Sequence, residues 1–273
     1  MGHVLGARAR VSRLLMAFGL VIAMAAATAA TATAGKPTPP PPPPPGAALY
    51  PDLQTVVPLH LNLVNQQQRD ELRFSNGVAN TGAGPLALRP ENVGDVTNGW
   101  QEFRDANGNV ISEKLASQYA FHPAHNHWHL ADVAKFEVRS GSPTGPVVGG
   151  NSIKVTFCLI DWYALDGNSA NPLKTFWDCE QGYQGISAGW VDQYHHALEG
   201  QSLDLTGVPN GTKYYLVSTA NPSNLFTETS YTNNIAWVKF TLSQESNGNR
   251  KVTVTGNSPC SSPGLCGVGA PNR

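Results

Sequence analysis

Short segments that are β-branched, or that alternate between apolar and polar residues, recur along the chain and constrain its fold class most. Gly, Asn and Pro lie between them, a spacing typical of strands joined by turns. We therefore expect a mostly β fold: a single β-sandwich domain with long loop insertions and little helix. The expected strands are Val56–Asn65, Leu72–Val78, Ala134–Val138, Ile153–Ile160, Lys213–Thr219, Ile235–Leu242 and Lys251–Thr255.

Two long stretches between these strands, about residues 90–118 and 161–189, are rich in Gly, Asn and aromatic residues. Long segments of this kind are commonly functional loops on a rigid scaffold, so we expect both to be loops. Helix is expected only as a turn or two near Gln184–Tyr194.

The N-terminal part has a different composition. Three arginines precede an apolar run from Leu14 to about Ala26, and small residues follow, an order that predicts a secretory signal peptide over residues 1–34. The proline-rich stretch 35–46 is expected to be a stiff polyproline II linker. No later segment approaches the ~18 apolar residues of a membrane span. We expect a secreted protein without a membrane span in its mature form, whose globular domain covers 47–273.

The four cysteines are even in number, and disulfides persist in an oxidising compartment. Three pairings are formally possible. The close spacing of Cys260 and Cys266 around Pro263 and Gly264 favours a small loop closed by that pair. This leaves Cys158–Cys179 to join the middle of the domain.

Four histidines stand within eight residues, and His125, His127 and His129 alternate strictly. Residues i, i+2 and i+4 of a strand share one face at ~6.6 Å intervals, so three imidazoles can converge on one ion if the strand bends. Imidazole suits zinc, copper, nickel and iron, and a three-histidine shell leaves a position for water or substrate. We predict a transition-metal site, whose ion the pattern does not name. The alternative is a histidine-rich surface strand.

Period-two alternation in Ile153–Leu159 places Phe157 and its apolar partners on one face and Lys154, Thr156 and Cys158 on the other. The apolar face should belong to the core. Taken alone, Lys154 is more typical of a solvated strand lysine than of a functional one.

Two further segments have unusual polarity. Asp192, His195 and His196 flank Tyr194, and two interpretations stay open: a second metal shell, or a tyrosine that caps the core beside surface histidines. Near the C-terminus, Asn221-Pro222 and residues 228–234 gather oxygen donors that suit a hard cation such as calcium. The alternative there is an Asx-rich turn between two strands.

Seven motifs of the chain stand in a distinctive order and spacing: Pro51-Asp52-Leu53, Leu72-Arg73-Phe74, His122 with His125, His127 and His129, Lys154 three residues before Phe157-Cys158-Leu159, Asp192 with Tyr194, Asn221-Pro222, and Tyr231-Thr232-Asn233-Asn234. Together they resemble the lysyl oxidase family over nearly all of residues 49–242. The ensemble is specific, although each element alone is weak.

The resemblance implies a secreted copper amine oxidase that converts primary amines, typically peptidyl lysine, to aldehydes and reduces molecular oxygen to hydrogen peroxide, with release of ammonia. It also implies an organic cofactor, lysine tyrosylquinone, made from one lysine and one tyrosine of the chain. A base must remove a proton from the substrate, and we expect Asp192, or alternatively His122. Carried over residue by residue, His125, His127 and His129 would hold copper, and Lys154 and Tyr194 would supply the cofactor.

The family also implies a calcium site, for which Asp52, the carbonyl of Leu53, Glu228, Asn233 and Asn234 stand at matching positions. Ser230 departs from the pattern because the family often has aspartate there, and the lost carboxylate lowers the negative charge. A second departure is Ala124, where animal enzymes have cysteine.

Three classes of protein are consistent with these features. The first is the quinone-dependent amine oxidase, which the histidines, Lys154 and Tyr194 together favour. The second is a secreted β-sandwich protein that binds copper or zinc without oxidase activity. The third is an adhesion module in which the histidines are incidental, and it explains the fewest features. The formal net charge of −1 provides no basic surface for nucleic acid, which is therefore not an expected partner.

Overall fold

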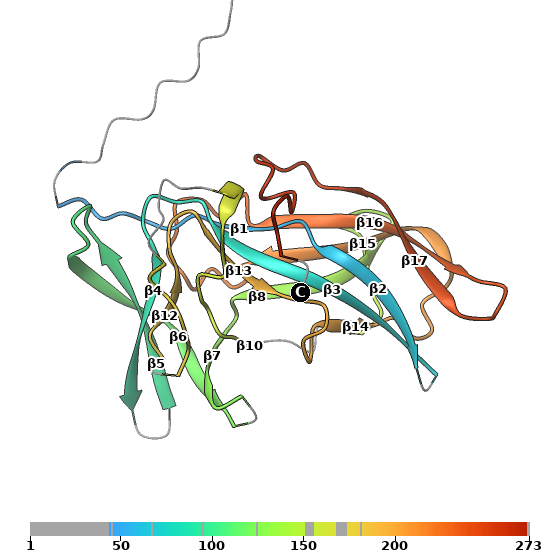
Figure 1. Cartoon of the computed structure of the whole chain (residues 1–273), viewed down its shortest axis with the longest axis horizontal. Coiled ribbons are helices and arrows are strands. Elements are labelled where there is room, and N and C mark those ends of the chain that lie inside the picture. Colours follow the sequence, from blue (N-terminus) through green and yellow to red (C-terminus); the bar gives the residue numbers. More distant parts are fainter. Residues whose placement is uncertain are drawn as a thin grey trace, which may run out of the picture. The chain divides into compact units, whose positions relative to one another are not determined.

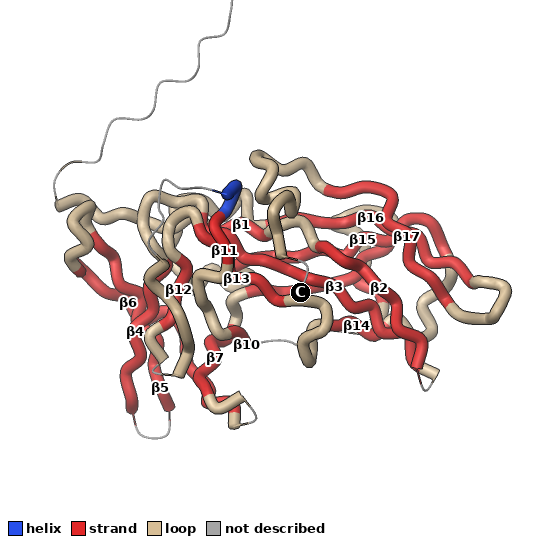
Figure 2. Tube along the Cα trace, viewed as in Figure 1, coloured by secondary structure: helices blue, strands red, loops and turns tan. Residues whose placement is uncertain are grey.

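The structure, a computed structural model, is mostly β, and the part of the chain that it describes is almost free of helix, which confirms the predicted class (Figures 1 and 2). The predicted signal peptide, most of the proline-rich linker and Lys154 lie outside the described residues. Among those that are described, no helix is long and apolar enough to cross a membrane. The described residues are 44, 46–66, 68–93, 96–123, 125–150, 156–167, 174–180 and 182–271.

The first sheet is organised around the long strand β3 (Arg69–Asn80), and all its pairings are antiparallel. Along one path the order is β1–β3–β13–β11, and β2 and β14 also pair with β3. Its other strands are β1 (Leu53–Thr55), β2 (Leu59–Gln66), β11 (Tyr163–Ala164), β13 (Trp190–Tyr194) and β14 (Ser202–Asp204).

The second sheet has six antiparallel strands in the order β10–β7–β6–β5–β4–β12. Consecutive hairpins build its centre, so neighbours in the chain are neighbours in the sheet. The strands are β4 (Leu86–Val93), β5 (Val96–Arg104), β6 (Val110–His122), β7 (His127–Ala131), β10 (Thr156–Phe157) and β12 (Gln184–Ile186).

The third sheet has five antiparallel strands in the order β17–β16–β15–β8–β9. Alternation is clearest in β16, where every second residue from Ala236 to Leu242 is buried, as expected of a strand with one face in the core. Its strands are β8 (Ala134–Ser140), β9 (Val147–Val148), β15 (Gly211–Ala220), β16 (Ile235–Gln244) and β17 (Arg250–Asn257).

A series of aromatic contacts runs from Phe74 in the core to Tyr194. The ring centroids of Phe74 and Phe136 lie 5.0 Å apart, those of Phe136 and Phe157 6.3 Å, and those of Phe157 and Tyr194 5.1 Å. Edge-to-face packing at such separations is favourable. The orientation of the Tyr194 ring is therefore fixed by its contact with Phe157, which in turn packs on the aromatic residues of the core.

Two sequence expectations are wrong. The stretch 90–118 is largely strand. It contains the end of β4, all of β5 and most of β6. Much of β6 is exposed, so it lacks an apolar alternation, and its pairing with β5 and β7 defines it as a strand. The expected helix near Gln184–Tyr194 is also absent, because β12 pairs with β4 and β13 with β3. Such long-range pairing overrides local preference.

Candidate metal and cofactor site

The histidine cluster is built on the hairpin of β6 and β7. His122 pairs with His127 across it, and the connecting turn includes Asn126 in the left-handed region, with φ +54°. Asparagine tolerates this conformation better than most residues. The predicted alternation holds for His127 and His129 in β7, but His125 belongs to the turn, outside the strand. The turn supplies the bend that convergence of three imidazoles requires.

The imidazoles of His125, His127 and His129 each offer a nitrogen, and these nitrogens lie within 4.8 Å of one another. The Nε2 atoms of His127 and His129 are 2.9 Å apart. His129 is buried, whereas His125 is exposed. The three residues therefore offer a convergent set of nitrogen donors at the edge of the protein.

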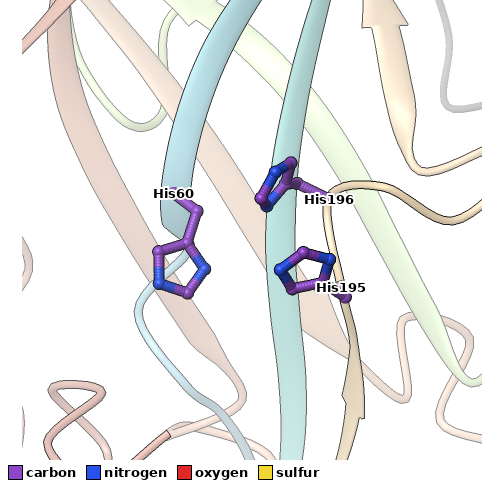
Figure 3. A group of neighbouring side chains, drawn as sticks. All are labelled: His60, His195 and His196. Carbon is purple, nitrogen blue, oxygen red and sulfur yellow. The ribbon is translucent and has the colours of Figure 1, made fainter. Parts of the chain in front are cut away.

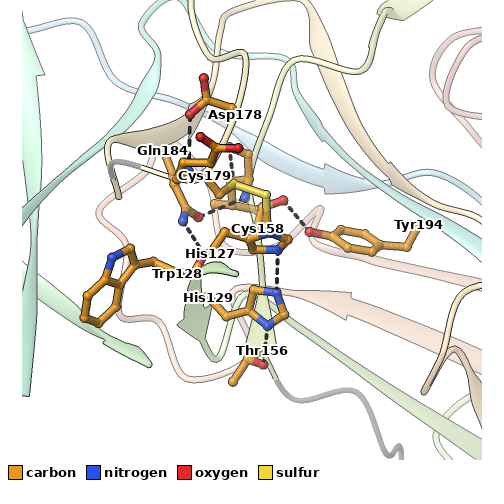
Figure 4. Close-up of a disulfide and its surroundings, with 11 residues drawn as sticks. His127, Trp128, His129, Thr156, Cys158, Asp178, Cys179, Gln184 and Tyr194 are labelled. Atoms are coloured by element: carbon orange, nitrogen blue, oxygen red, sulfur yellow. Dashed lines mark hydrogen bonds between the residues drawn. A yellow bond between two sulfur atoms is a disulfide. The ribbon is translucent and has the colours of Figure 1, made fainter. Parts of the chain in front are cut away.

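The Thr156 hydroxyl contacts the His129 ring, and its Oγ1 lies 3.0 Å from Nδ1 of that ring (Figure 4). A histidine whose Nδ1–H donates to such a partner presents the Nε2 lone pair to a metal. Sequence reasoning did not identify this role for Thr156. The alternation that placed Thr156 on the same face as Lys154 and Cys158 could have suggested it.

The backbone of β7 is held by the segment that follows the first disulfide. Both predicted disulfides, Cys158–Cys179 and Cys260–Cys266, are present. Trp128 N–H donates to the carbonyl of Cys179 at 3.2 Å, and Gln184 Nε2 donates to the carbonyl of Trp128 at 2.5 Å (Figure 4). Trp128 lies between His127 and His129, so these bonds fix the strand that carries both histidines.

Tyr194 is buried at the end of β13 and donates its phenolic hydrogen to the carbonyl of Cys158 (Figure 4). Burial raises the pKa of Tyr194 well above its usual value, and the neighbouring carboxylate of Asp192 raises it further. Desolvation penalises the phenolate, and a nearby negative charge penalises it again. Tyr194 is therefore a neutral phenol in the protein as described.

One cavity of about 480 Å³ brings the predicted residues together. His125, His127 and His129 line it, as do Asp192 and Tyr194. Its remaining wall is partly apolar, and Trp162 and Leu198 are both about half exposed there (46% and 45%). Concave, mostly apolar sites with a few convergent polar groups are typical ligand sites.

The two candidate bases differ in position. Asp192 is buried and lines this cavity. His122 instead stacks on His125, with ring centroids 4.2 Å apart, and it is not among the residues that line the cavity. Lys154 lies outside the described residues. Of the two candidate bases, Asp192 is the one that lines the cavity.

The residues of the predicted calcium site also come together. Asn233 Nδ2 donates to Asp52 Oδ2 at 3.0 Å, and Asn234 Nδ2 donates to Glu228 Oε1 at 2.8 Å. Leu53 contributes its N–H, which donates to Glu228 Oε2 at 2.7 Å. The Oδ1 atoms of Asp52, Asn233 and Asn234 are buried without a hydrogen-bond partner.

Buried oxygen atoms without a donor are uncommon in native proteins. Oxygen is also the ligand atom that calcium takes in proteins, so these residues fit the expected ion. Asn221, which the sequence placed with these oxygen donors, contacts the group through its amide nitrogen: its Nδ2 donates to Glu228 Oε1 at 2.6 Å.

Comparison with known proteins gives a consistent result. The lysyl oxidase family model matches residues 105–252. Lysyl oxidase homolog 2 of Bos taurus is 30% identical over 140 residues, which are 50% of this chain and 16% of that protein. Lysyl oxidase homolog 3B of Danio rerio is 32% identical over 117 residues, 42% of this chain and 14% of that protein. The matched part thus spans only about a sixth of each of these relatives.

Proposed function

Since the chain belongs to the lysyl oxidase family, we propose that it is a copper-dependent amine oxidase whose lysine tyrosylquinone forms from Lys154 and Tyr194. One observation carries this proposal: three convergent imidazoles, Asp192 and Tyr194 line one cavity. The quinone and the use of copper are inferences from this arrangement together with family membership.

His125, His127 and His129 would hold the copper ion. An all-imidazole donor set suits copper, and Thr156 keeps the His129 ring in a metal-binding orientation. When bound, copper supplies the redox chemistry by which oxygen converts a tyrosine ring to a quinone. The protein's own contribution is positional: the Cys158 carbonyl and the Phe157 ring hold Tyr194 at the cavity wall.

The finished quinone supplies an electrophilic carbonyl for the substrate amine. Asp192 would accept the proton from the carbon next to nitrogen, because it is the carboxylate residue beside Tyr194 that lines the same cavity. The balanced reaction converts R–CH2–NH2, oxygen and water into R–CHO, ammonia and hydrogen peroxide. Trp162 and Leu198 provide an apolar wall for an alkyl chain, which fits a small primary amine or a peptidyl lysine.

We propose that the protein is exported through the signal peptide 1–34. Its two disulfides fit this location, because disulfides persist in oxidising compartments. No nucleic-acid partner is proposed, since the formal net charge is −1.

The decisive test is a peptide map of copper-reconstituted, full-length protein. We expect one cross-linked peptide that joins Lys154 to Tyr194, a phenylhydrazine adduct at that peptide, and peroxide release from simple primary amines. Separate, unmodified Lys154 and Tyr194 peptides in an active sample would refute the cofactor assignment. Bound copper without a quinone or peroxide would instead support a metal-binding protein without oxidase activity.

We further propose that Asp52, Asn233, Asn234, Glu228 and the Leu53 carbonyl bind calcium. Saturation at 100 times Kd would stabilise the folded chain by about 2.7 kcal/mol, which corresponds to a rise in Tm of roughly 5–10 °C for a domain of this size. We expect Asp52→Asn to lose most of this rise, because the variant lacks the carboxylate charge. Differential scanning calorimetry with and without calcium measures the effect.

Asp178→Asn is the matched control for this experiment. Asp178 is exposed, and its Oδ1 accepts a hydrogen bond from the nearby Glu180 N–H. The control should therefore keep the full calcium-dependent rise in Tm. An equal rise in Asp52→Asn would argue against the proposed ligands.

A further inference from the structure

A second group of histidines lies outside the predicted copper ligands. His60 follows Leu59 on β2, and His195 follows Tyr194 on β13. Leu59 pairs with Ser75 and Tyr194 pairs with Asn76, so adjacent positions of β3 organise both segments. Figure 3 shows His60 facing His195 and His196. Sequence reasoning missed His60 because about 135 residues separate it from the other two.

The three rings are close enough to share one ion. Each offers a nitrogen, and these nitrogens lie within 4.8 Å of one another. The ring centroids of His195 and His196 are 4.0 Å apart, and that of His60 lies 5.9 Å and 5.8 Å from them. Two ring nitrogens, His195 Nε2 and His196 Nδ1, are buried without a hydrogen-bond partner. Such atoms are uncommon in native proteins unless a ligand or ion satisfies them.

The backbone positions His60 in an unusual way. Its φ is +53°, a left-handed conformation that residues other than glycine seldom adopt. The register between β2 and β3 shifts between Leu59 and Asn62, so His60 lies in a bulge. Bulges commonly re-aim a side chain. Here the bulge lets the imidazole reach the segment after β13.

Ser75 joins the two sides of the group. Its Oγ lies 2.9 Å from His60 Nδ1 and accepts the His196 backbone N–H at 3.0 Å. When His60 Nδ1–H donates to this oxygen, Nε2 is left as a metal donor, as in histidines held by an outer partner. When a metal binds His195 through Nε2, the ring proton moves to Nδ1. The Ala197 N–H, which donates to Nδ1 over a long 3.3 Å, then loses that acceptor.

We propose that His60, His195 and His196 form a second metal site that takes a late divalent transition metal, zinc or copper. The donor set is entirely imidazole, which suits these ions and not calcium or magnesium. The charged side chain of Arg73 lies beside the group, and its Nη1 donates to the His196 carbonyl at 3.4 Å. His195 also lines the cavity that contains Tyr194 and Asp192 in its wall. The bound ion would therefore fix the segment after β13, which forms part of the wall of that cavity.

Metal stoichiometry tests this site separately from amine oxidation. Full-length protein is stripped with a chelator, dialysed against zinc in the presence of excess calcium, and analysed for bound metal. We expect two zinc ions per wild-type chain, one in His60→Asn/His196→Gln, and one in His127→Gln/His129→Gln. Asparagine suits position 60 because it tolerates a positive φ. Combining all four substitutions should leave no tightly bound zinc.

Circular dichroism and intact disulfides establish that each variant is folded. Asn62→Gln, at an exposed position of the same strand, is the matched control and should keep two ions. A His60→Asn/His196→Gln variant that binds as much zinc as the wild type, or a His127→Gln/His129→Gln variant that binds none, would overturn the second site. Because no readout involves a quinone or peroxide, this proposal and the amine oxidase proposal fail independently.

Discussion

Tyr194→Phe is expected to abolish amine oxidation and leave copper binding intact. Phenylalanine has no phenolic oxygen from which a quinone can form, so the chemistry that the cofactor carries is lost. Activity should fall by the ~10⁶-fold or more that enzymes typically contribute, which in practice is the assay background. Peroxide release from a primary amine, phenylhydrazine labelling and copper content are the three measurements.

Tyr214→Phe is the matched control for this variant. Tyr214 is also a buried tyrosine, and its hydroxyl donates to the carbonyl of Pro209 at 2.7 Å. Each variant loses one hydrogen bond to a backbone carbonyl, which costs about 1 kcal/mol of folding stability. Tyr214→Phe should keep its activity, because Tyr214 does not line the cavity. Undiminished peroxide release by Tyr194→Phe would disprove the assigned cofactor.

The second large effect is expected for His129→Gln. His129 is buried and contacts both His127 and Thr156, and the substitution removes one of the three proposed copper ligands. Removing an outer-shell partner of a metal ligand typically costs 10–100-fold in affinity; we expect a loss greater than about 100-fold here. Copper titration of the stripped protein measures the affinity. The Lys154–Tyr194 cross-link should be absent although both residues are present.

His122→Gln is the control for position and residue type. It removes an imidazole from the same hairpin but leaves the three proposed ligands in place. Copper affinity close to that of the wild type is therefore expected. If His122→Gln lost copper as severely as His129→Gln, a four-histidine shell would replace the three-histidine assignment.

Local patterns predicted much of the fold. Alternation identified strands such as Ile235–Leu242, because burial of every second residue leaves a direct trace in the sequence. Alternation did not predict β6 or β12, because the sequences of these two strands show little of it. Their conformation follows from backbone pairing with distant strands. Solvent-exposed or short strands are therefore the elements that residue patterns missed.

The same distinction applies to the candidate site. The spacing of His127 and His129 predicted their common face, and the cysteine positions predicted both disulfides. The sequence did not reveal that His125 lies in a turn, because the backbone must reverse there to pair β6 with β7. Nor did it show His60 beside His195, since that contact depends on two strands meeting β3 at adjacent residues.

The sequence by itself thus determined the β class, the disulfide pairs and the family, and it predicted His125, His127 and His129 as metal ligands, because each of these depends on residue type and spacing. Only the tertiary structure decided that Asp192 and Tyr194 share a cavity with those histidines and that His122 does not line it. The physical reason is that β13 is positioned by its hydrogen bonds to β3, more than 100 residues away in the chain.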